Sequence, residues 1–131
     1  MARQKVDLIG DLAILRGATF DLWKPQLSGD WTLWQPKAEI RTNYLSSDGE
    51  LITSFDHSAA TYDAEEDLTT FNPYLTPTKT LLLPVTKYQG GDLVPSVKNC
   101  LVWDWQIALD GVVYSLAAGF MQVQPEVTEN D

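Results

Sequence analysis

The chain has 131 residues, of which 44% are hydrophobic and 21% charged, which excludes global disorder and favours one domain with its own core. Its formal net charge is −9, with only nine Lys and Arg residues. This balance argues against nucleic acid and anionic membranes as partners, because both require a concentrated basic face. The single cysteine, Cys100, excludes an internal disulfide framework and a cysteine-rich zinc site, and we expect it to be a small core residue.

The amino-terminal residues 1–11 predict an extended arm. No signal peptide is expected, because Asp7 and Asp11 occur before any apolar stretch forms. The longest apolar runs are far shorter than a membrane span. Together with the lack of disulfides, these features fit synthesis in a reducing cytoplasm.

The first third of the chain predicts short strands and one loop. Residues 12–15 and 18–23 are expected as two strands around a bend at Gly17. Residues 25–34 are expected as a loop, because they contain Pro, Gly and Asp. Residues 36–42 alternate, with Ala38 and Ile40 inward, and predict a half-buried antiparallel strand.

The middle of the chain predicts further strands between turns. The expected order is a turn over residues 43–49, strands over 50–55 and 58–62, and an acidic turn over 63–67. Pro73 interrupts residues 68–75, which favours an edge strand or an irregular segment over a central strand. Residues 80–83 are expected as one short strand and 86–95 as a loop, with at most one helical turn.

Residues 100–124 predict the longest element, a hairpin that turns at Asp110-Gly111. An Asp-Gly turn would place five pairs on one apolar face: Leu109–Val112, Ile107–Tyr114, Trp105–Leu116, Trp103–Ala118 and Leu101–Phe120. The opposite face would carry Asp104, Gln106 and Ser115. Beyond Phe120 the apolar positions shift by one residue, which favours a β-bulge near Ala118-Gly119. A segment buried on both faces is the alternative.

No residues in the sequence form a recognisable catalytic or metal-binding motif, and we expect no catalytic, cofactor-binding or metal-binding residue. The only histidine, His57, lies between Asp56 and Ser58, but adjacent residues of an extended chain point to opposite sides and cannot form a relay. We expect it to be a turn histidine. An EF-hand loop starting at Asp63 would need Gly and Glu where Leu68 and Tyr74 stand, so a solvated acidic turn is expected there.

Aromatic residues in and near the predicted loops suggest a binding surface. They are Trp23, Trp31, Trp34, Phe71 and Tyr74. Three interpretations stay open: they cover the ends of a sandwich, they anchor a protein interface, or they stack on sugars. For a protein interface, the expected partner-contacting residues are Trp31, Trp34, Phe71 and Tyr74.

A series of short motifs resembles a small domain of tailed bacteriophages. In that family the order is G-D-T-F, x-A-x-I-R, Y-D-h-x, D-G-x-V and G-x-V-x-V-x-x-D-V-T. Here the matching stretches are residues 16–20, 36–41, 103–106, 110–114 and 119–128. Ala18, Trp103 and Glu126 stand where the family usually has an acid, Tyr and Asp, and residues 26–33 lack its Leu-Thr-Gly turn. The order covers residues 12–128 and is similar to the amino-terminal domain of baseplate upper proteins and to small virion proteins associated with tail fibres.

The resemblance implies an all-β, Ig-like antiparallel β-sandwich with a long C-terminal hairpin. We expect an arm at residues 1–11, the sandwich at 12–128 and a tail at 129–131. The implied function is that of a non-enzymatic virion protein in the tail or baseplate, which attaches fibre or receptor-binding components by oligomeric packing. Its expected partners are other virion proteins and further copies of itself, and the arm offers a strand to a neighbour. The alternatives are a capsid decoration protein and a carbohydrate-binding module, with an enzyme behind both.

Overall fold

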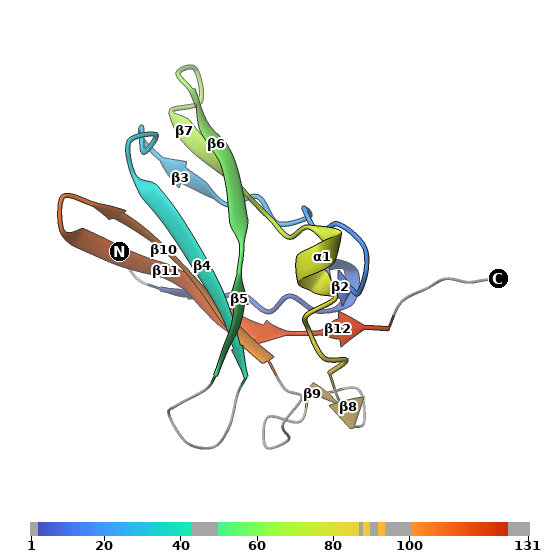
Figure 1. The fold of residues 1–131 in the computed structure, drawn as a ribbon. Helices are drawn as coiled ribbons and strands as arrows, with labels where there is room; N and C mark the ends of the chain where they lie inside the picture. Colours follow the sequence, from blue (N-terminus) through green and yellow to red (C-terminus); the bar gives the residue numbers. More distant parts are fainter. Residues whose placement is uncertain (1–2, 43–49, 87, 90–91, 94–100, 126–131) are drawn as a thin grey trace.

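The computed structural model describes residues 3–42, 50–86, 88–89, 92–93 and 101–125, and these form several β-sheets with very little helix (Figure 1). The all-β, sandwich-like fold predicted from the sequence is thereby confirmed. The turn predicted over residues 43–49, Cys100 and the tail at 129–131 lie outside the described residues.

The larger sheet has five strands in the order β1-β11-β10-β4-β5. Their bounds are β1 Gln4–Lys5, β4 Gln35–Thr42, β5 Leu51–Ser54, β10 Leu101–Leu109 and β11 Val112–Met121. All neighbours are antiparallel except β1, which runs parallel to β11. As predicted, Ala38 and Ile40 of β4 are fully buried.

The smaller sheet has three strands in the order β3-β7-β6, with bounds β3 Gln26–Ser28, β6 Asp56–Asp63 and β7 Leu68–Tyr74. The chain passes from the larger sheet to the smaller one at Phe55, the single residue between β5 and β6. Two short ladders complete the sheets: β2 Ile14–Leu15 with β12 Val123–Gln124, and β8 Tyr88–Gln89 with β9 Asp92–Leu93. The helical pieces are η1 Gly10–Leu12 and α1 Pro77–Thr80.

The core lies between the two sheets and is built on tryptophan and phenylalanine. Trp105 of β10 packs edge-on against Phe71 of β7, with ring centroids 5.1 Å apart. Trp23 packs edge-on against both Trp103 and Trp105. The alternating sequence of β10 places Leu101, Trp103, Trp105 and Ile107 on the buried face, as the hairpin pattern predicts.

The C-terminal hairpin turns at Asp110-Gly111, as predicted. Both residues have positive φ angles, +50° and +84°, the combination that a two-residue hairpin turn requires. The predicted pairs Leu109–Val112 and Ile107–Tyr114 are present.

The predicted bulge position is wrong, and the bulge occurs earlier in β11. Gln106 pairs with Ser115 but Trp105 pairs with Ala117, so Leu116 is the extra residue. The ladder then continues regularly through Gly119, with Trp103 opposite Gly119 and Leu101 opposite Met121. Three predicted pairs are therefore shifted by one residue: Trp105–Leu116, Trp103–Ala118 and Leu101–Phe120. The physical reason is that Leu116 and Ala117 both enter the core, which moves Ala118 and Phe120 to the outer face.

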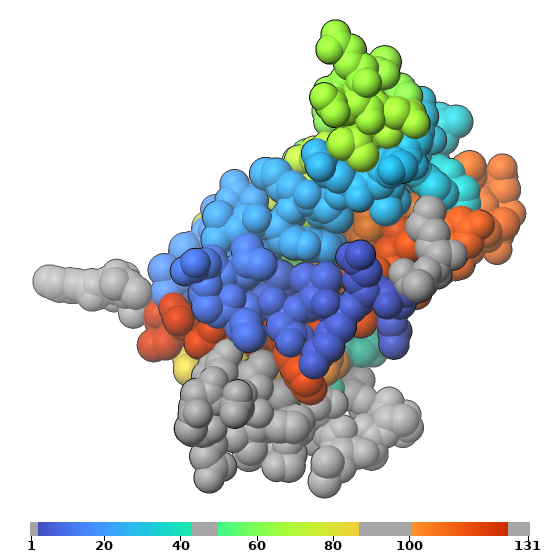
Figure 2. Space-filling model, turned by 180° about the vertical axis from the view of Figure 1, so that it is seen from behind, coloured from blue at the N-terminus to red at the C-terminus, as the bar shows by residue number. Residues whose placement is uncertain are grey.

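The amino-terminal arm pairs with the chain's own last long strand. Backbone N–H groups of Val6 and Leu8 donate to the carbonyls of Ala118 and Phe120, both at 2.9 Å, and Leu8 is fully buried. Gly119 permits this approach, because a Cβ there would overlap the backbone oxygen of Val6. Figure 2 shows the arm lying across the C-terminal strands. The strand that the sequence suggested for a neighbour is thus used within this chain.

Several segments differ from their predictions. Residues 18–23 form no strand and make only an isolated bridge, between Phe20 and Leu75. Residues 80–83 form no strand, because Thr76 caps a short helix and Pro77 occupies its first turn, where a missing N–H costs nothing. The predicted loop 25–34 contains β3, which pairs with β7. The predicted loop 86–95 contains β8 and β9.

β7 is the middle strand of its sheet, although Pro73 predicted an edge or irregular segment. Phe71 N–H donates to the carbonyl of Pro25, and Leu75 N–H donates to the carbonyl of Phe20. Pro73 lies between them on the same side, where β3 no longer runs beside β7. The missing N–H therefore falls at a position where no backbone partner is needed.

Candidate functional site

Three aromatic side chains gather where the β3–β4 loop meets β11. The rings of Trp34 and Tyr114 are stacked, with centroids 5.4 Å apart and planes 25° from parallel. Trp31 contacts both, at 5.1 Å from Trp34 and 6.2 Å from Tyr114. We call Trp31, Trp34 and Tyr114, together with Leu33 and Val112, the aromatic surface.

The aromatic surface includes two exposed apolar side chains: Leu33, which precedes Trp34 in the loop, and Val112, which lies two residues before Tyr114 on β11. Leu33 is 76% exposed and Val112 is 47% exposed, whereas the three aromatic rings are half-buried. Apolar side chains that are exposed beside partly buried aromatic rings are typical of the centre of a protein interface. Tyr114 and Val112 share one face of β11, because they are two residues apart on the strand.

Hydrogen bonds to β7 hold the β3–β4 loop in place. The buried hydroxyl of Thr69 donates to the carbonyl of Gly29 at 2.7 Å and accepts from the N–H of Trp31 at 2.8 Å. The indole N–H of Trp31 donates to the carbonyl of Ser28 at 2.7 Å. Thr32 donates to Asp30 from its hydroxyl and its backbone N–H, which lowers the pKa of that carboxyl. The aromatic surface is thus pre-organised, which reduces the entropy lost on binding.

The structure brings together only two of the four residues that the sequence suggested for a partner interface. Trp31 and Trp34 belong to the aromatic surface. Phe71 is 1% exposed and packs on Trp105, so it is a core residue. Tyr74 is half-buried at the far end of β7, opposite Asp56. Tyr114 lies on the core-side face of the hairpin, as predicted, but its contacts with Trp31 and Trp34 were not predicted, because they depend on how the loop folds onto β11.

His57 lies on β6 and is half-buried, so the expectation of a turn histidine is wrong. Its Nε2 accepts a hydrogen bond from the indole N–H of Trp105 at 3.2 Å, which requires an unprotonated nitrogen. Burial lowers the pKa of His57 to about 4; the charge of Asp56 opposes this shift and that of Lys79 adds to it. The imidazole therefore serves the core as a neutral acceptor.

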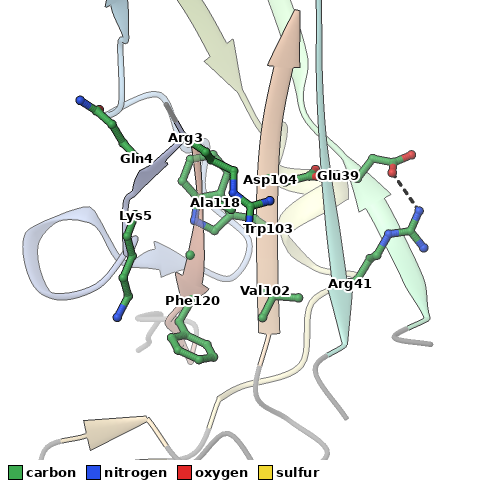
Figure 3. Close-up of a pocket in the computed structure, with 11 residues that line it drawn as sticks. Arg3, Gln4, Lys5, Glu39, Arg41, Val102, Trp103, Asp104, Ala118 and Phe120 are labelled. Atoms are coloured by element: carbon green, nitrogen blue, oxygen red, sulfur yellow. Dashed lines mark hydrogen bonds and ion pairs between the residues drawn. The ribbon is translucent and has the colours of Figure 1, made fainter. Parts of the chain in front are cut away.

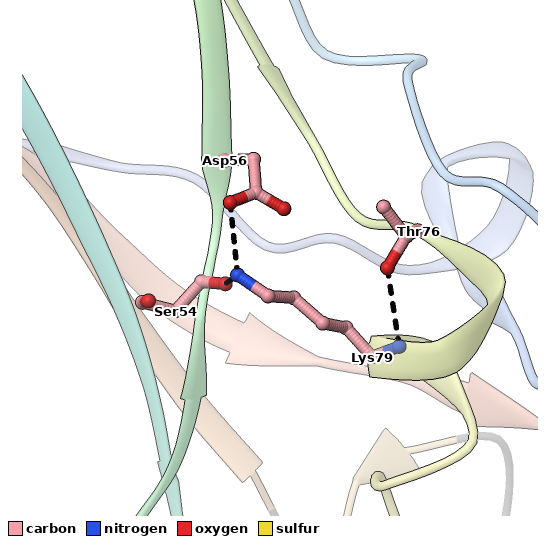
Figure 4. A network of polar contacts seen from close by, with 4 residues as sticks. All are labelled: Ser54, Asp56, Thr76 and Lys79. Carbon is pink, nitrogen blue, oxygen red and sulfur yellow. Dashed lines mark hydrogen bonds and ion pairs between the residues drawn. The ribbon is translucent and has the colours of Figure 1, made fainter.

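Lys79 ties the short helix α1 to the place where the chain changes sheets (Figure 4). Its Nζ donates to the carbonyl of Ser54 at 2.9 Å and to the carboxylate of Asp56 at 3.0 Å. Its backbone N–H is capped by the Thr76 hydroxyl at 3.3 Å. These contacts fix the bend at Phe55 between β5 and β6.

A groove of about 510 Å³ lies on the outer face of the larger sheet (Figure 3). Its apolar lining includes Val102, Ala118 and Phe120, the last two placed there by the bulge in β11. Asp104 also lies on this face, as predicted. Arg41 donates to Glu39 at 2.8 Å, which lowers the pKa of the Glu39 carboxyl.

No group of three or more His, Cys, Asp or Glu side chains among the described residues is placed to hold a metal ion. No helix in the described part of the chain is long and apolar enough to span a membrane.

No family model matches the chain, and no curated protein matches it.

Proposed function

We propose that this chain is a non-enzymatic structural protein of a tailed-phage virion, an adaptor in the tail or baseplate that attaches fibre or receptor-binding components by oligomeric packing. The observation that carries the proposal is the order of phage-domain motifs along residues 12–128. The first motif ends at Phe20, which pairs with Leu75, and the next three fall in β4, β10 and the turn into β11. The motifs therefore describe the framework of the domain.

The aromatic surface supports an interface role for this framework. It combines exposed apolar side chains, half-buried aromatic rings and a loop already fixed by hydrogen bonds. We propose that it contacts another virion protein. The stacking of Trp34 on Tyr114 leaves each ring one face at most for a further ligand, so a protein surface fits better than a row of sugar rings.

Mass spectrometry of purified particles, with and without tails, tests the location. The adaptor proposal expects the protein in tailed particles, at a copy number that is a multiple of three or six, and expects its loss with the tails. Retention on tailless shells would favour the capsid decoration alternative. Absence from particles would overturn the proposal.

Substitution in the aromatic surface tests the interface. Leu33→Asp changes a side chain that is 76% exposed and should leave the fold intact, while incorporation into tails falls about tenfold or more. Leu22→Asp is the matched control, because Leu22 is 59% exposed in a different segment. Equal incorporation of the two variants would show that the aromatic surface is not the contact.

A glycan array separates the carbohydrate-binding alternative. The adaptor proposal expects no glycan signal that depends on Trp34. A glycan bound by the wild-type chain and lost in a folded Trp34→Ala variant would favour the carbohydrate-binding module instead.

A further inference from the structure

Positive charge in this acidic protein is concentrated on the outer face of the larger sheet. Of the seven Lys and Arg residues that the structure describes, four lie there: Arg3, Lys5, Lys37 and Arg41. Arg3, Lys5 and Arg41 line the groove, together with two acids, Glu39 and Asp104. A third acid, Asp7, lies beside Lys5 and Phe120, so the outer face as a whole has four cations and three acids, a small positive balance in a chain whose formal net charge is −9.

The cations of the groove stay accessible. The Lys5 side chain is 73% exposed and that of Arg41 is 43% exposed, although each contacts an acid of its own chain. The Lys5 ammonium also lies 5.9 Å from the centroid of the Phe120 ring. Figure 3 shows Arg3 and Lys5 on one side of Val102 and Arg41 on the other. A protruding acidic segment with an apolar or aromatic member fits such a lining.

The same chain carries an acidic segment, with Tyr62 beside it, at the tip of the β6–β7 hairpin. Residues 63–67 contain four acids, Asp63, Glu65, Glu66 and Asp67, and all are exposed. The tip is held in shape, because the Asp63 carboxylate accepts from the N–H of Glu65 at 2.9 Å. Tyr62, which is 37% exposed, donates its hydroxyl to Asp67 at 2.6 Å. The hairpin projects from the rest of the molecule in both views (Figures 1 and 2).

We propose that the outer-face groove binds the acidic β6–β7 tip of a second copy of this chain. Charge complementarity argues for this occupant, since the outer face around the groove has accessible cations and a small positive balance, whereas the tip has four acids and no cation. Figure 1 places the tip away from the strands that form the groove, so one molecule does not fill its own groove. Each copy can thus give its tip to a neighbour and receive a neighbour's tip, which generates a reciprocal dimer, a ring or an open chain of subunits. The inference rests on the proposed function for the place of assembly, the virion.

Sedimentation of the full chain tests the self-association first. We expect oligomers at an ionic strength of about 0.1 M and dissociation at about 1 M, because the contact depends on accessible charges. A chain that stays monomeric at about 0.1 M and high protein concentration overturns the proposal.

A charge exchange tests the two surfaces. We expect Glu65→Lys with Glu66→Lys, and separately Lys5→Glu with Arg41→Glu, to weaken self-association about tenfold or more. An equal mixture of the two variants should associate again, because the reversed tip then meets the reversed groove. Unchanged self-association of the tip variant, or a mixture that stays monomeric, overturns the proposal.

Controls separate charge from folding and from the proposed function. Lys24→Glu alters an exposed cation outside the groove and should leave self-association unchanged. Circular dichroism checks that each variant is folded. If the groove variant does not fold, the tip variant still decides the test, because Glu65 and Glu66 are exposed. Self-association through the groove by a protein absent from particles would leave this inference standing and overturn the proposed function. If the protein is found in tails but its self-association is unchanged by the charge exchange, the proposed function stands and this inference is overturned.

Discussion

At the scale of single residues, two glycines serve the hairpin for different reasons. Gly111 has a φ of +84° and open space around its Cα, so only its backbone conformation demands glycine. At Gly119 the arm lies so close that a Cβ would overlap the Val6 backbone. Glycine is therefore required at Gly111 by the turn conformation and at Gly119 by the close approach of the arm to β11.

Gly119→Ala should destabilise the protein and release the arm. We expect the free energy of unfolding to fall by about 1–3 kcal/mol, because the added methyl group has no room beside Val6. Urea denaturation measures the loss, and hydrogen exchange of the Leu8 amide reports the arm. Gly111→Ala is the control: it should cost about 1 kcal/mol through its positive φ, without faster exchange at Leu8. Slow exchange at Leu8 in the Gly119→Ala variant would contradict this account.

His57 should make stability depend on pH in the mildly acidic range. Burial lowers its folded pKa to about 4, below the ordinary 6.5, so the unfolded chain takes up the proton more readily. The stabilisation is complete above about pH 6.5 and is lost as the pH falls toward 4. Allowing for partial exposure, the loss between about pH 7 and about pH 5 is of the order of 1 kcal/mol.

The His57→Gln variant checks this titration. The Gln amide oxygen still accepts a hydrogen bond but does not titrate, so unfolding curves of the variant should change less between these two pH values. Parallel pH profiles for the two proteins would show that His57 is not the titrating group.

At the scale of elements, the β3–β4 loop is held by a side chain from another sheet strand. Thr69 is fully buried on β7, and its hydroxyl serves two backbone groups of the loop, at Gly29 and Trp31. The aromatic surface therefore depends on a residue that it does not include.

Thr69→Val should loosen this loop. It keeps the shape but leaves the Gly29 carbonyl and the Trp31 N–H without their partner, at a cost of about 1–3 kcal/mol. We expect a fluorescence change from Trp31 and Trp34 together with lower stability in urea. Thr70→Val is the control, because Thr70 is only half-buried and its hydroxyl accepts from the Gln26 side chain. If the two variants behave alike, the loop is not anchored through Thr69.

Elements set by local sequence were predictable, and those set by neighbours were not. The Asp110-Gly111 turn follows from two adjacent residues, and the buried face of β4 follows from alternation. The central place of β7 was not predictable, because Pro73 is harmless only where β3 ends. Thr76 followed by Pro77 is itself a local signal for a helix start, so α1 belongs to the predictable elements. Likewise, Trp31 and Trp34 were found as loop aromatics, whereas their contact with Tyr114 depends on the fold.

At the scale of the whole molecule, the two sheets share one core and one crossing of the chain. The β5–β6 passage at Phe55 belongs to both sheets, and Trp105 of the larger sheet contacts Phe71 and His57 of the smaller. Neither sheet therefore has an apolar face that is buried without the other.

The two sheets should unfold together. Thermal transitions followed by tryptophan fluorescence and by far-ultraviolet circular dichroism should coincide, because most tryptophans contact the shared core. Dynamic light scattering at the same protein concentration controls for aggregation. Two separated transitions would contradict a single cooperative unit.

The pairing of the arm with β11 also has a consequence for the order of events during translation. Val6 leaves the ribosome long before Ala118, yet its N–H donates to that residue's carbonyl. The arm therefore waits for β11, and Leu8 stays outside this core until Met121 has emerged. Contacts so distant in sequence form slowly. Until β11 has been made, the nascent chain therefore carries an unpaired segment with an apolar side chain, Leu8, to which a chaperone can bind.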